Sequence, residues 1–327
     1  MRLLILGGTE FVGRAIAAAA TGRGWPVTVF HRGRHPAPAG VEVRHGDRAT
    51  ADLDALREGE WDAVVDTWTG APRAVRDAAA LLTGRAHRYA YISSRSVYAY
   101  PAPPGLPEDG PLVDGSADAG DVDYPQAKRG GELAATGAYG EHALLVRAGL
   151  VLGPGENVGR LPWWLHRIAR GGPVLAPGPA DLPLQYIDAR DLAAFTLDAL
   201  AAGRHGPYNV VSPSGHTTMG ELLHACATAT GSTADLRWWD PDRILAAGIE
   251  PWTELPVWLP PGEQHDTMHR GDVSRALAAG LRCRPVTDTV TDTWTWLRDL
   301  PAAPQRPDRP RAGLDPDREA ALLAAPS

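Results

Sequence analysis

The sequence predicts an α/β fold, in which a doubly wound parallel sheet is followed by a smaller C-terminal α/β lobe. In the first half, short apolar runs alternate with alanine-rich stretches of helical periodicity. Strands that are apolar throughout and separated by helices are typical of a parallel sheet covered on both faces. The second half is less regular and rich in Pro and Trp, and a chain of 327 residues leaves room for two lobes with a core in each.

The elements of the first half follow in order from this alternation. Apolar runs predict strands at residues 3–6, 27–30, 41–44, 63–66, 88–93 and 143–147. Between them, helices are expected at residues 12–21, 72–82 and 124–136. Residues 101–120 are rich in Pro, Gly and Asp, which predicts a long surface loop.

The second half predicts a less regular series. Helices are expected at residues 157–170, 188–202 and 219–230, and short strands at 184–187 and 208–211. Asp188 and Asp191 open an apolar-periodic run, as N-capping residues do. We therefore expect a cofactor domain at 1–150 and a substrate lobe at 151–300, with 184–202 returning to the first domain. Residues 301–327 form a Pro/Arg-rich extension, expected to be exposed, with packing against the body of the protein as the open alternative, and to contain a short amphipathic helix near 317–325.

Charge and composition exclude two classes of partner. The chain has 32 Lys and Arg against 39 Asp and Glu, a formal net charge of −7, so it lacks the basic field that binds nucleic acid. No apolar run approaches the roughly 18 residues that span a bilayer, and the apolar start is too short for a signal peptide. Cys226 and Cys283 stand far apart, which indicates no disulfide framework and a cytoplasmic location. The expected partner is a small molecule, and a homodimer is compatible with the sequence.

A glycine-rich turn directly follows the first strand. Gly7 and Gly8 permit a tight turn, and Gly13 permits close packing of the helix that follows. The N-terminus of that helix would present free N–H groups and a positive dipole end, which suit a pyrophosphate. A glycine triplet alone is a weak signal, but its place after a buried strand favours a dinucleotide. The residues expected at the phosphates are Gly7, Gly8, Thr9, Glu10, Phe11, Val12 and Gly13.

The end of the second strand bears on the choice of dinucleotide. An acidic residue at this place selects the free 2′-hydroxyl of NAD, but here the strand runs into His31, Arg32 and Arg34. These arginines could hold the 2′-phosphate, so NADP(H) is favoured and NAD(H) remains open. Asp47 and Arg48, after the third strand, are placed near the adenine, although an ordinary turn aspartate explains Asp47 equally well.

The sharpest chemical signal is the segment from Tyr124 to Lys128. Residues four apart share one face of a helix, so the phenol and the ammonium can enter one site. A phenol ordinarily titrates near 10, and a cation about 4 Å away stabilises its anion by about 4 kcal/mol, or about three pKa units. Lys128 is the only lysine in the chain, whereas the other 31 basic residues are Arg. A chance surface pair is therefore a poor explanation.

A serine completes the expected catalytic set. Ser93, Ser94 and Ser96 follow a buried strand, and the carboxyl ends of strands in doubly wound sheets line the ligand crevice. We expect Ser94 to hydrogen-bond a substrate carbonyl while Tyr124 donates a proton to it and a nicotinamide supplies hydride. Ser93 and Ser96 are interpreted as polar loop residues.

Together these motifs resemble the extended short-chain dehydrogenase/reductase superfamily, within it the NAD-dependent epimerase/dehydratase-like group. They lie at residues 7–13, 93–98, 124–128, 145–154, 186–193 and 206–210, so the resemblance covers roughly residues 1–300. It implies a Rossmann domain and catalytic positions for Ser94, Tyr124 and Lys128. It also implies that Asp66, Thr67 and Trp68 line the cofactor near its nicotinamide half.

The departures from that group bear on the substrate. Glu10 replaces a loop glycine, which places an acid near the phosphates unless it turns outward or pairs with an arginine such as Arg32. The dehydratases of this group share a Thr-Asp-Glu segment, and this chain has Ser94-Arg95-Ser96 at the corresponding position. Without those two acids, dehydration of a sugar is disfavoured. The Asn and Arg with which epimerases hold a nucleotide diphosphate are absent near 148–151 and 184–187, which disfavours a nucleotide sugar.

What remains is reduction of a carbonyl or imine on a small, partly apolar molecule. The expected pocket residues are Trp68, Ser94, Tyr98, Trp163 and Trp164, with Trp252 and Trp258 as further walls, although core packing would explain each tryptophan as well. An NAD-retaining epimerase or isomerase is the alternative enzyme, and a non-catalytic cofactor-binding regulator is the alternative of another class. No metal is expected, because His265 and His269 lack a third ligand.

Overall fold

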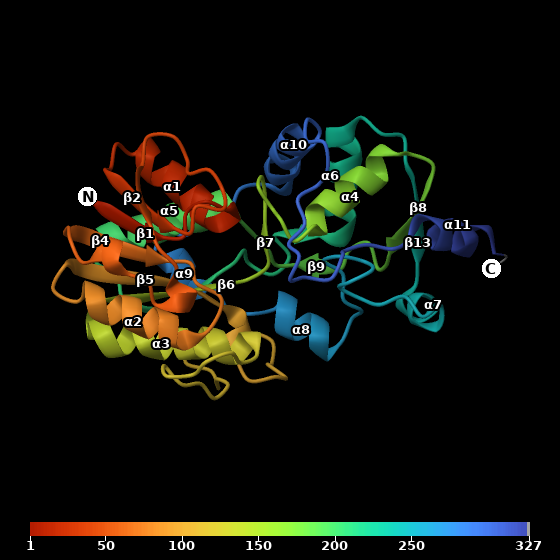
Figure 1. The fold of residues 1–327 in the computed structure, drawn as a ribbon. Helices are drawn as coiled ribbons and strands as arrows, with labels where there is room; N and C mark the ends of the chain where they lie inside the picture. Colours follow the sequence, from red (N-terminus) through yellow and green to blue (C-terminus); the bar gives the residue numbers. More distant parts are fainter. Residues whose placement is uncertain (326–327) are drawn as a thin grey trace.

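The computed structural model describes residues 1–325, which form two lobes lying side by side (Figure 1). The first contains a seven-stranded sheet in the order β11-β6-β5-β4-β1-β2-β3, with every neighbouring pair parallel. This order is that of a doubly wound Rossmann-like sheet, so the predicted fold class is confirmed. Its strands are β1 (Leu3–Leu6), β2 (Val27–His31), β3 (Glu42–His45), β4 (Trp61–Asp66), β5 (Ala86–Ser94), β6 (Ala143–Ala148) and β11 (Gly206–Val210).

Helices cover both faces of this sheet because its central strands are apolar on both sides. In β1, Leu3 and Ile5 pack on one face, under α1 (Phe11–Gly22) and α5 (Ala189–Ala201). Leu4 and Leu6 point the opposite way, toward α2 (Pro72–Leu82) and α3 (Tyr124–Tyr139). Alternation along the strand thus divides one apolar run between two cores.

The second lobe is built around a separate apolar core. Trp164 and Trp258 are fully buried in it, and Thr218 begins one of its helices with a capping box completed by Glu221. Its larger elements are α4 (Arg160–Ala169), β8 (Pro173–Pro177), α6 (Met219–Thr230), β13 (Asp235–Trp239), α7 (Pro241–Ala246), α8 (Glu263–His269), α10 (Val286–Leu297) and α11 (Pro316–Ala324). A further helix, α9 (Ser274–Ala278), packs on β11 of the first lobe.

Short elements complete the chain and correct one prediction. They are β7 (Val151–Leu152), β9 (Pro183–Leu184), β10 (Ile187–Asp188), β12 (Thr217–Thr218), and the 3₁₀ turns η1 (Arg48–Thr50), η2 (Asp54–Leu56), η3 (Arg95–Val97) and η4 (Gly140–His142). Residues 184–187 do not form one strand: β9 pairs antiparallel with β12, and β10 pairs parallel with β7. The chain therefore changes its pairing strand between β9 and β10. No helix within the described residues combines the length and the apolar character that crossing a bilayer requires.

The C-terminal extension packs against the second lobe, which is the alternative that the sequence left open to full exposure. Leu314 is only 2% exposed and belongs to the core of the second lobe. Glu319 on α11 is buried, forms an ion pair with Arg167 and accepts a hydrogen bond of 3.0 Å from the Leu175 amide. Because breaking a buried ion pair is costly, α11 is firmly docked on the second lobe.

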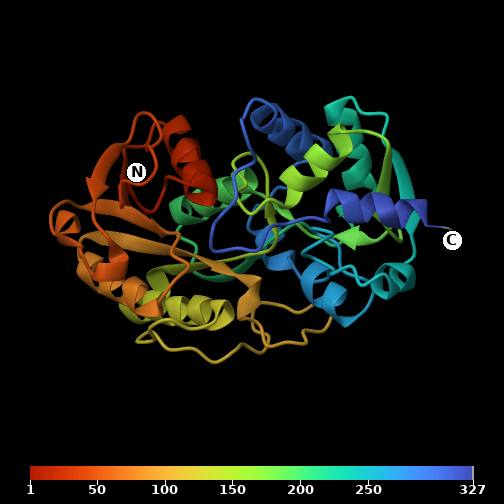
Figure 2. The ribbon, with the colours of Figure 1, turned by 45° about the vertical axis from the view of Figure 1, so that its right-hand side comes forward.

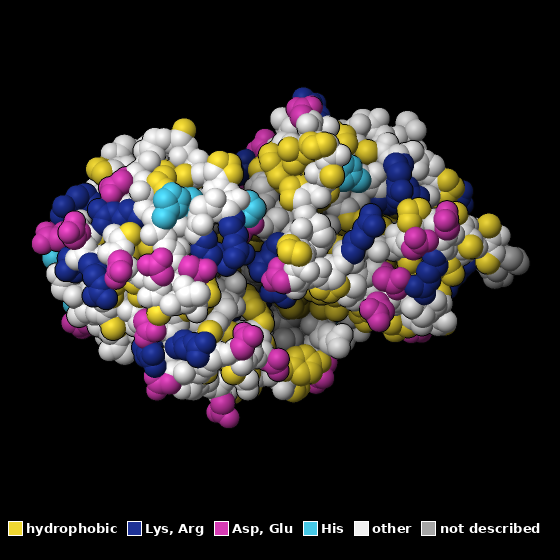
Figure 3. All heavy atoms as spheres, in the orientation of Figure 1, with side chains coloured by type: hydrophobic (Ala, Val, Ile, Leu, Met, Phe, Trp, Pro, Cys, Tyr) yellow, Lys and Arg dark blue, Asp and Glu magenta, His cyan; other side chains and the backbone are white. Residues whose placement is uncertain are grey.

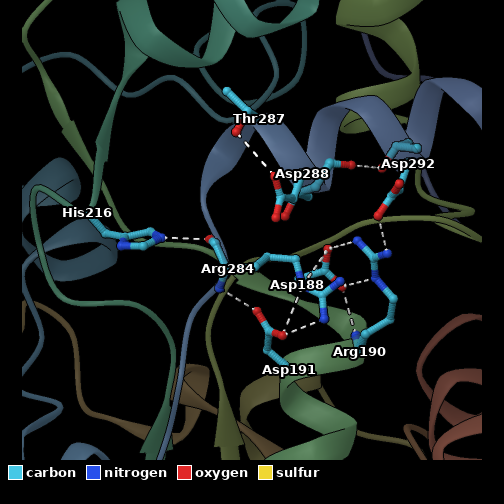
Figure 4. Close-up of polar contacts among 10 residues, drawn as sticks. Asp188, Arg190, Asp191, His216, Arg284, Thr287, Asp288 and Asp292 are labelled. Carbon is cyan, nitrogen blue, oxygen red and sulfur yellow. Dashed lines mark hydrogen bonds and ion pairs between the residues drawn. The ribbon is translucent and has the colours of Figure 1, made fainter. Parts of the chain in front are cut away.

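An ion-pair cluster joins the two lobes at the start of α5 (Figure 4). Asp188 caps α5 and pairs with Arg190 at 2.7 Å. Asp191 pairs at 2.7 Å with Arg284, which precedes α10, and Arg190 also reaches Asp292 on α10. Although burial alone would raise it, Arg190 and Arg284 hold the pKa of Asp188 below its ordinary value. The cluster ties α5 of the sheet domain to α10 of the second lobe.

Candidate active site

Tyr124 and Lys128 lie one turn apart at the start of α3. Tyr124 is its first residue, and Pro125 at the next position suits the first turn of a helix. The Lys128 side chain is buried, and its Nζ donates hydrogen bonds of 2.7 Å to the carbonyl oxygens of Trp68 and Ile92. Nζ lies 5.9 Å from the centre of the Tyr124 ring. A fixed ammonium thus stands beside the phenol.

Burial shapes the protonation of this lysine. Desolvation lowers the pKa of Lys128 to about 7, a shift opposed by the charges of Asp66 and Glu132 and assisted by those of Arg48 and Arg306. The ammonium also lies 4.8 Å from the centre of the Tyr91 ring. Because the pKa falls near neutrality, a small change in nearby charge changes the protonation of Lys128.

The lowered pKa predicts a specific pH dependence of stability. A lysine titrates near 10.5 when unfolded and near 7 here, so between these values the unfolded chain binds more protons. Wild-type stability should therefore rise with pH relative to Lys128→Met, by at most about 1.4 kcal/mol per pH unit. Urea unfolding of both proteins between about pH 7 and about pH 9 measures this slope. Parallel curves would contradict the buried, titrating ammonium.

Ser94 closes the carboxyl end of β5. Its side chain is buried, and its Oγ accepts a hydrogen bond of 3.1 Å from the Ser96 amide and lies 3.1 Å from the Ser96 Oγ. Ser93 instead donates a hydrogen bond of 2.7 Å to Glu132 on α3. Neighbouring residues of a strand point to opposite faces, so only one of the two serines contacts Glu132.

A buried polar network next to these residues was missed in the sequence. Glu132 lies one turn beyond Lys128 and binds Ser93 and the guanidinium of Arg147, whose Nε is 2.8 Å from its Oε1. Arg147 donates to the Tyr98 hydroxyl at 3.0 Å, and that hydroxyl donates to Asn209 at 2.8 Å. The four-residue spacing from Lys128 to Glu132 was the signal that could have revealed it.

This network corrects the prediction for Tyr98. A pocket wall would present its ring to a substrate, but Tyr98 is only 7% exposed and both roles of its hydroxyl are occupied. Its guanidinium neighbour, Arg147, stacks 5.0 Å from the ring centre. Tyr98 therefore joins β5 and the buried network instead of facing a ligand.

The glycine turn has the shape that a dinucleotide requires. A Cβ on Gly13 would lie 2.6 Å from the Gly8 nitrogen, so only glycine allows α1 to pack this closely on the turn. Gly7, at φ +118°, faces the Thr67 hydroxyl, which would lie 2.2 Å from an added Cβ. Among the described residues, no side chain caps the first turn of α1. Its N–H groups are therefore free for an anion, and the residues fit a pyrophosphate.

Glu10, next to this turn, does not pair with Arg32. Its carboxylate lies 3.3 Å from Nε2 of His35 and accepts a hydrogen bond of 3.5 Å from Asn157 of the second lobe. About half of the Glu10 side chain is exposed. Glu10 is thus held by one partner from the sheet domain and one from the second lobe. Thr9, Phe11 and Val12 follow the course of the turn into α1.

The residues predicted to bind the adenosine end of the cofactor form two groups, one without side-chain partners among the described residues and one bound to the backbone. Arg32 and Arg34 are exposed, and neither makes an ion pair or side-chain hydrogen bond within residues 1–325. His31 accepts a hydrogen bond of 3.0 Å from the Gly33 amide, and Asp47 caps η1 by accepting one of 2.9 Å from Ala49. The two free guanidiniums are therefore available to a ligand.

Arg48 and Asp66 correct the prediction that both line the cofactor. Asp66 is fully buried, and its carboxylate binds Arg48 at 2.5 Å and 2.8 Å and the Tyr89 hydroxyl at 2.5 Å. Arg48 is buried too. Each charge neutralises the other, so these side chains stabilise the end of β4. Thr67 faces the glycine turn, and Trp68 contributes the carbonyl that holds Lys128.

The tryptophans of α4 correct another expectation. Trp164 is completely buried and donates a hydrogen bond of 2.7 Å to the Pro256 carbonyl, so it belongs to the core of the second lobe. Trp258 is buried in the same core. Trp163 packs edge-on against Trp164 at 4.5 Å and is partly buried beside Gly313 of the extension. Core packing thus explains Trp164 and Trp258.

His265 and His269 form a buried pair without a metal cluster. Their rings lie 5.1 Å apart, His265 Nε2 is 2.9 Å from the Pro183 carbonyl, and His269 Nδ1 accepts from the Gln185 amide at 3.0 Å. Burial lowers the pKa of His269 to about 3. Within residues 1–325, no group of three or more His, Cys, Asp or Glu has the geometry to hold a metal ion.

The doubly wound sheet, the glycine turn and the Tyr-Lys pair one helical turn apart define the class of the short-chain dehydrogenases/reductases. The model of the NAD dependent epimerase/dehydratase family matches residues 62–211. The epimerase family protein SDR39U1 of Bos taurus is 30% identical over 271 residues, which cover 72% of this chain and 82% of that protein. The chain belongs to the NAD-dependent epimerase/dehydratase family.

Solved structures share the fold at lower identity. UDP-N-acetylglucosamine 4-epimerase from Bacillus cereus superposes with a TM-score of 0.65 at 15% identity, covering 91% of this chain and 99% of that one. WbmG of Bordetella bronchiseptica, solved in complex with NAD and UDP, superposes with a TM-score of 0.65 at 19% identity, covering 92% and 94%. These similarities show that the chain shares the fold of these enzymes. The reaction has to be inferred from the residues of the site.

Proposed function

We propose that the protein reduces a carbonyl or imine of a small molecule with NADP(H). The observation that carries this proposal is the placement of Lys128, buried and held by two carbonyl oxygens beside the Tyr124 ring. A single cation fixed next to a phenol stabilises the phenolate that remains after proton donation. Such an arrangement suits proton transfer to a substrate oxygen.

The residues of the chain then take distinct roles. The Tyr124 hydroxyl donates its proton to the carbonyl oxygen, and Lys128 stabilises the phenolate left behind. The Ser94 hydroxyl donates a hydrogen bond to the same oxygen and orients it. The α1 turn holds the pyrophosphate through its uncapped N–H groups. When bound, the nicotinamide supplies the hydride.

The choice of NADP(H) over NAD(H) rests on the free arginines after β2. Arg32→Ala should weaken NADPH binding by about ten- to a hundred-fold and leave NADH binding nearly unchanged, because only NADPH carries a 2′-phosphate. Fluorescence titration of both cofactors measures the two affinities. Arg57→Ala, an exposed arginine paired only with Asp54, is the matched control. Equal losses for the two cofactors would contradict the 2′-phosphate role.

An NAD-retaining epimerase is the second candidate, favoured by the likeness to a 4-epimerase and to NAD-bound structures. Such an enzyme returns the hydride to the same substrate and keeps its cofactor. The two proposals differ at purification, because the epimerase would arrive with NAD bound. Titration with NADPH and NADH, followed by a panel of aldehydes and ketones monitored by the absorbance of reduced nicotinamide, tests the reductase. A cofactor-free protein that consumes neither reduced cofactor with any carbonyl would contradict it.

A further inference from the structure

The Pro/Arg-rich extension passes beside the candidate active site before it reaches α11. Figure 2 shows the segment between α10 and α11 running between the two lobes. The Arg306 amide donates a hydrogen bond of 2.9 Å to the Asn157 carbonyl, and the Gly313 amide donates one of 2.8 Å to Thr253. These two bonds anchor residues 306–313 near the N-terminus of α4.

This path brings Arg309 to Tyr124, and the charge of Arg309 also acts on a second arginine, Arg160 of α4. The guanidinium carbon of Arg309 lies 5.3 Å from the centre of the Tyr124 ring. Arg160, the first residue of α4, stacks 5.4 Å from the centre of the Trp252 ring. Within residues 1–325, neither guanidinium takes part in an ion pair or a side-chain hydrogen bond. Figure 3 shows Lys and Arg side chains gathered where the two lobes meet.

The third arginine of this region differs because it is already neutralised. Arg306 pairs with Asp308 at 2.6 Å. Glu156 attracts Arg160, but both of its oxygens also accept backbone hydrogen bonds, from Arg160 at 2.7 Å and from Leu161 at 3.0 Å. Burial also raises the pKa of Glu156 to about 7, so its negative charge is partial at neutral pH.

The electrostatic consequence is an excess of positive charge, because three arginines face Asp308 and a partly protonated Glu156. Desolvation lowers the pKa of Arg160, and the charge of Arg309 lowers it further, against the pull of Glu156 and Tyr124. Two cations close together cost free energy when the nearby acids do not fully offset them. Here Glu156 is the acid that acts on Arg160, while Asp308, beside Arg309, is already paired with Arg306. A bound anion would remove that cost and satisfy both guanidiniums with charge-assisted hydrogen bonds.

We propose that Arg160 and Arg309 bind an anionic oxygen group of the substrate, a carboxylate or a phosphate, beside Tyr124. This inference rests on the proposed function and narrows its substrate class to small carbonyl compounds that carry such a group. The guanidiniums hold the anion, and Tyr124 acts on the carbonyl of the same molecule. The extension is thereby a part of the substrate site.

Binding of simple aromatic probes tests this without turnover. Benzoate and phenyl phosphate represent the two anions, and benzamide is the neutral control of similar shape. Calorimetric titration of the full chain, with and without saturating NADP⁺, should show at least one anion binding more tightly than benzamide by on the order of ten-fold or more. Which of the two binds more tightly identifies the anion.

Two variants and one control locate the site. Arg309→Gln and Arg160→Gln should each weaken the preferred anion by on the order of ten- to a hundred-fold and leave benzamide unchanged. Arg311→Gln, exposed in the same segment, should have no effect. Because Arg309 is exposed, its variant should fold normally even if Arg160→Gln does not.

Three results would overturn the anion site. The anions could bind no better than benzamide, Arg311→Gln could weaken them as much as Arg309→Gln does, or Arg309→Gln could tighten all three probes, which would mean that the segment blocks the crevice. A chain that binds the anions but consumes no reduced cofactor would contradict the reductase and leave the anion site standing. If the chain reduces neutral carbonyls without binding the anions, the anion site would be contradicted and the reductase proposal would stand.

Discussion

Tyr124→Phe is expected to lower turnover by about 10²- to 10⁴-fold, because the variant removes the proton donor from the reacting oxygen. The ring remains, so its packing against Arg309 and the start of α3 should persist. Cofactor affinity should therefore be unchanged. Steady-state rates with the best carbonyl substrate and a cofactor titration measure the two quantities separately.

The matched control for this variant is Tyr100→Phe. Tyr100 is 58% exposed and its hydroxyl lies at the surface, 3.3 Å from Glu263, so this change should leave turnover at the wild-type level. If Tyr124→Phe kept full activity, the phenol could not be the proton donor. If it lost cofactor binding as well, the effect would be structural.

Lys128→Arg is expected to lower turnover by at least about 10²-fold and to destabilise the fold by about 1–3 kcal/mol. The lysine is fully enclosed, and its three N–H donors meet two carbonyl oxygens at 2.7 Å. A planar guanidinium is larger and cannot place one compact charge at the same point. The variant therefore keeps the charge but displaces it.

The control for this exchange is the reverse change at a surface position. Arg57→Lys, at an exposed residue paired with exposed Asp54, should alter neither turnover nor unfolding. Rates and urea denaturation of both variants provide the comparison. Wild-type activity in Lys128→Arg would show that any cation serves at this position, and a specific requirement for lysine would then be excluded.

Much of the sheet domain could be predicted because its signals are local. The run from Leu3 to Leu6 is apolar on both faces and has to be a buried strand, and a glycine turn after it is visible without any tertiary contact. The elements of the second lobe were harder to predict from the sequence. Its β8 and β13 pair across about sixty residues, and Pro173 and Pro177 at the ends of β8 obscure the strand pattern. Such pairing depends on tertiary contacts that a local pattern does not show.

The residues of the candidate site also fall into those that local sequence signals predicted and those that depend on tertiary contacts. Tyr124 and Lys128 were found because one helical turn brings them together, and the rarity of lysine marked the position. Arg48 and Asp66 were misassigned because sequence spacing does not reveal that the two side chains bind each other in the interior. The approach of Arg309 to Tyr124 joins residues from opposite ends of the chain, so only the fold could show it.

Transfer of a label from the cofactor tests the central claim most directly. The full chain is incubated with NADPH that carries deuterium at the transferable position of its nicotinamide, together with charged and neutral small aldehydes, and the alcohols are analysed by mass spectrometry. We expect one deuterium in each alcohol molecule, with labelled alcohol formed about 10²- to 10⁴-fold more slowly by Tyr124→Phe than by the wild type. Alcohol without deuterium, or equal rates of labelled-alcohol formation by the two proteins, would contradict hydride transfer with Tyr124 as the proton donor.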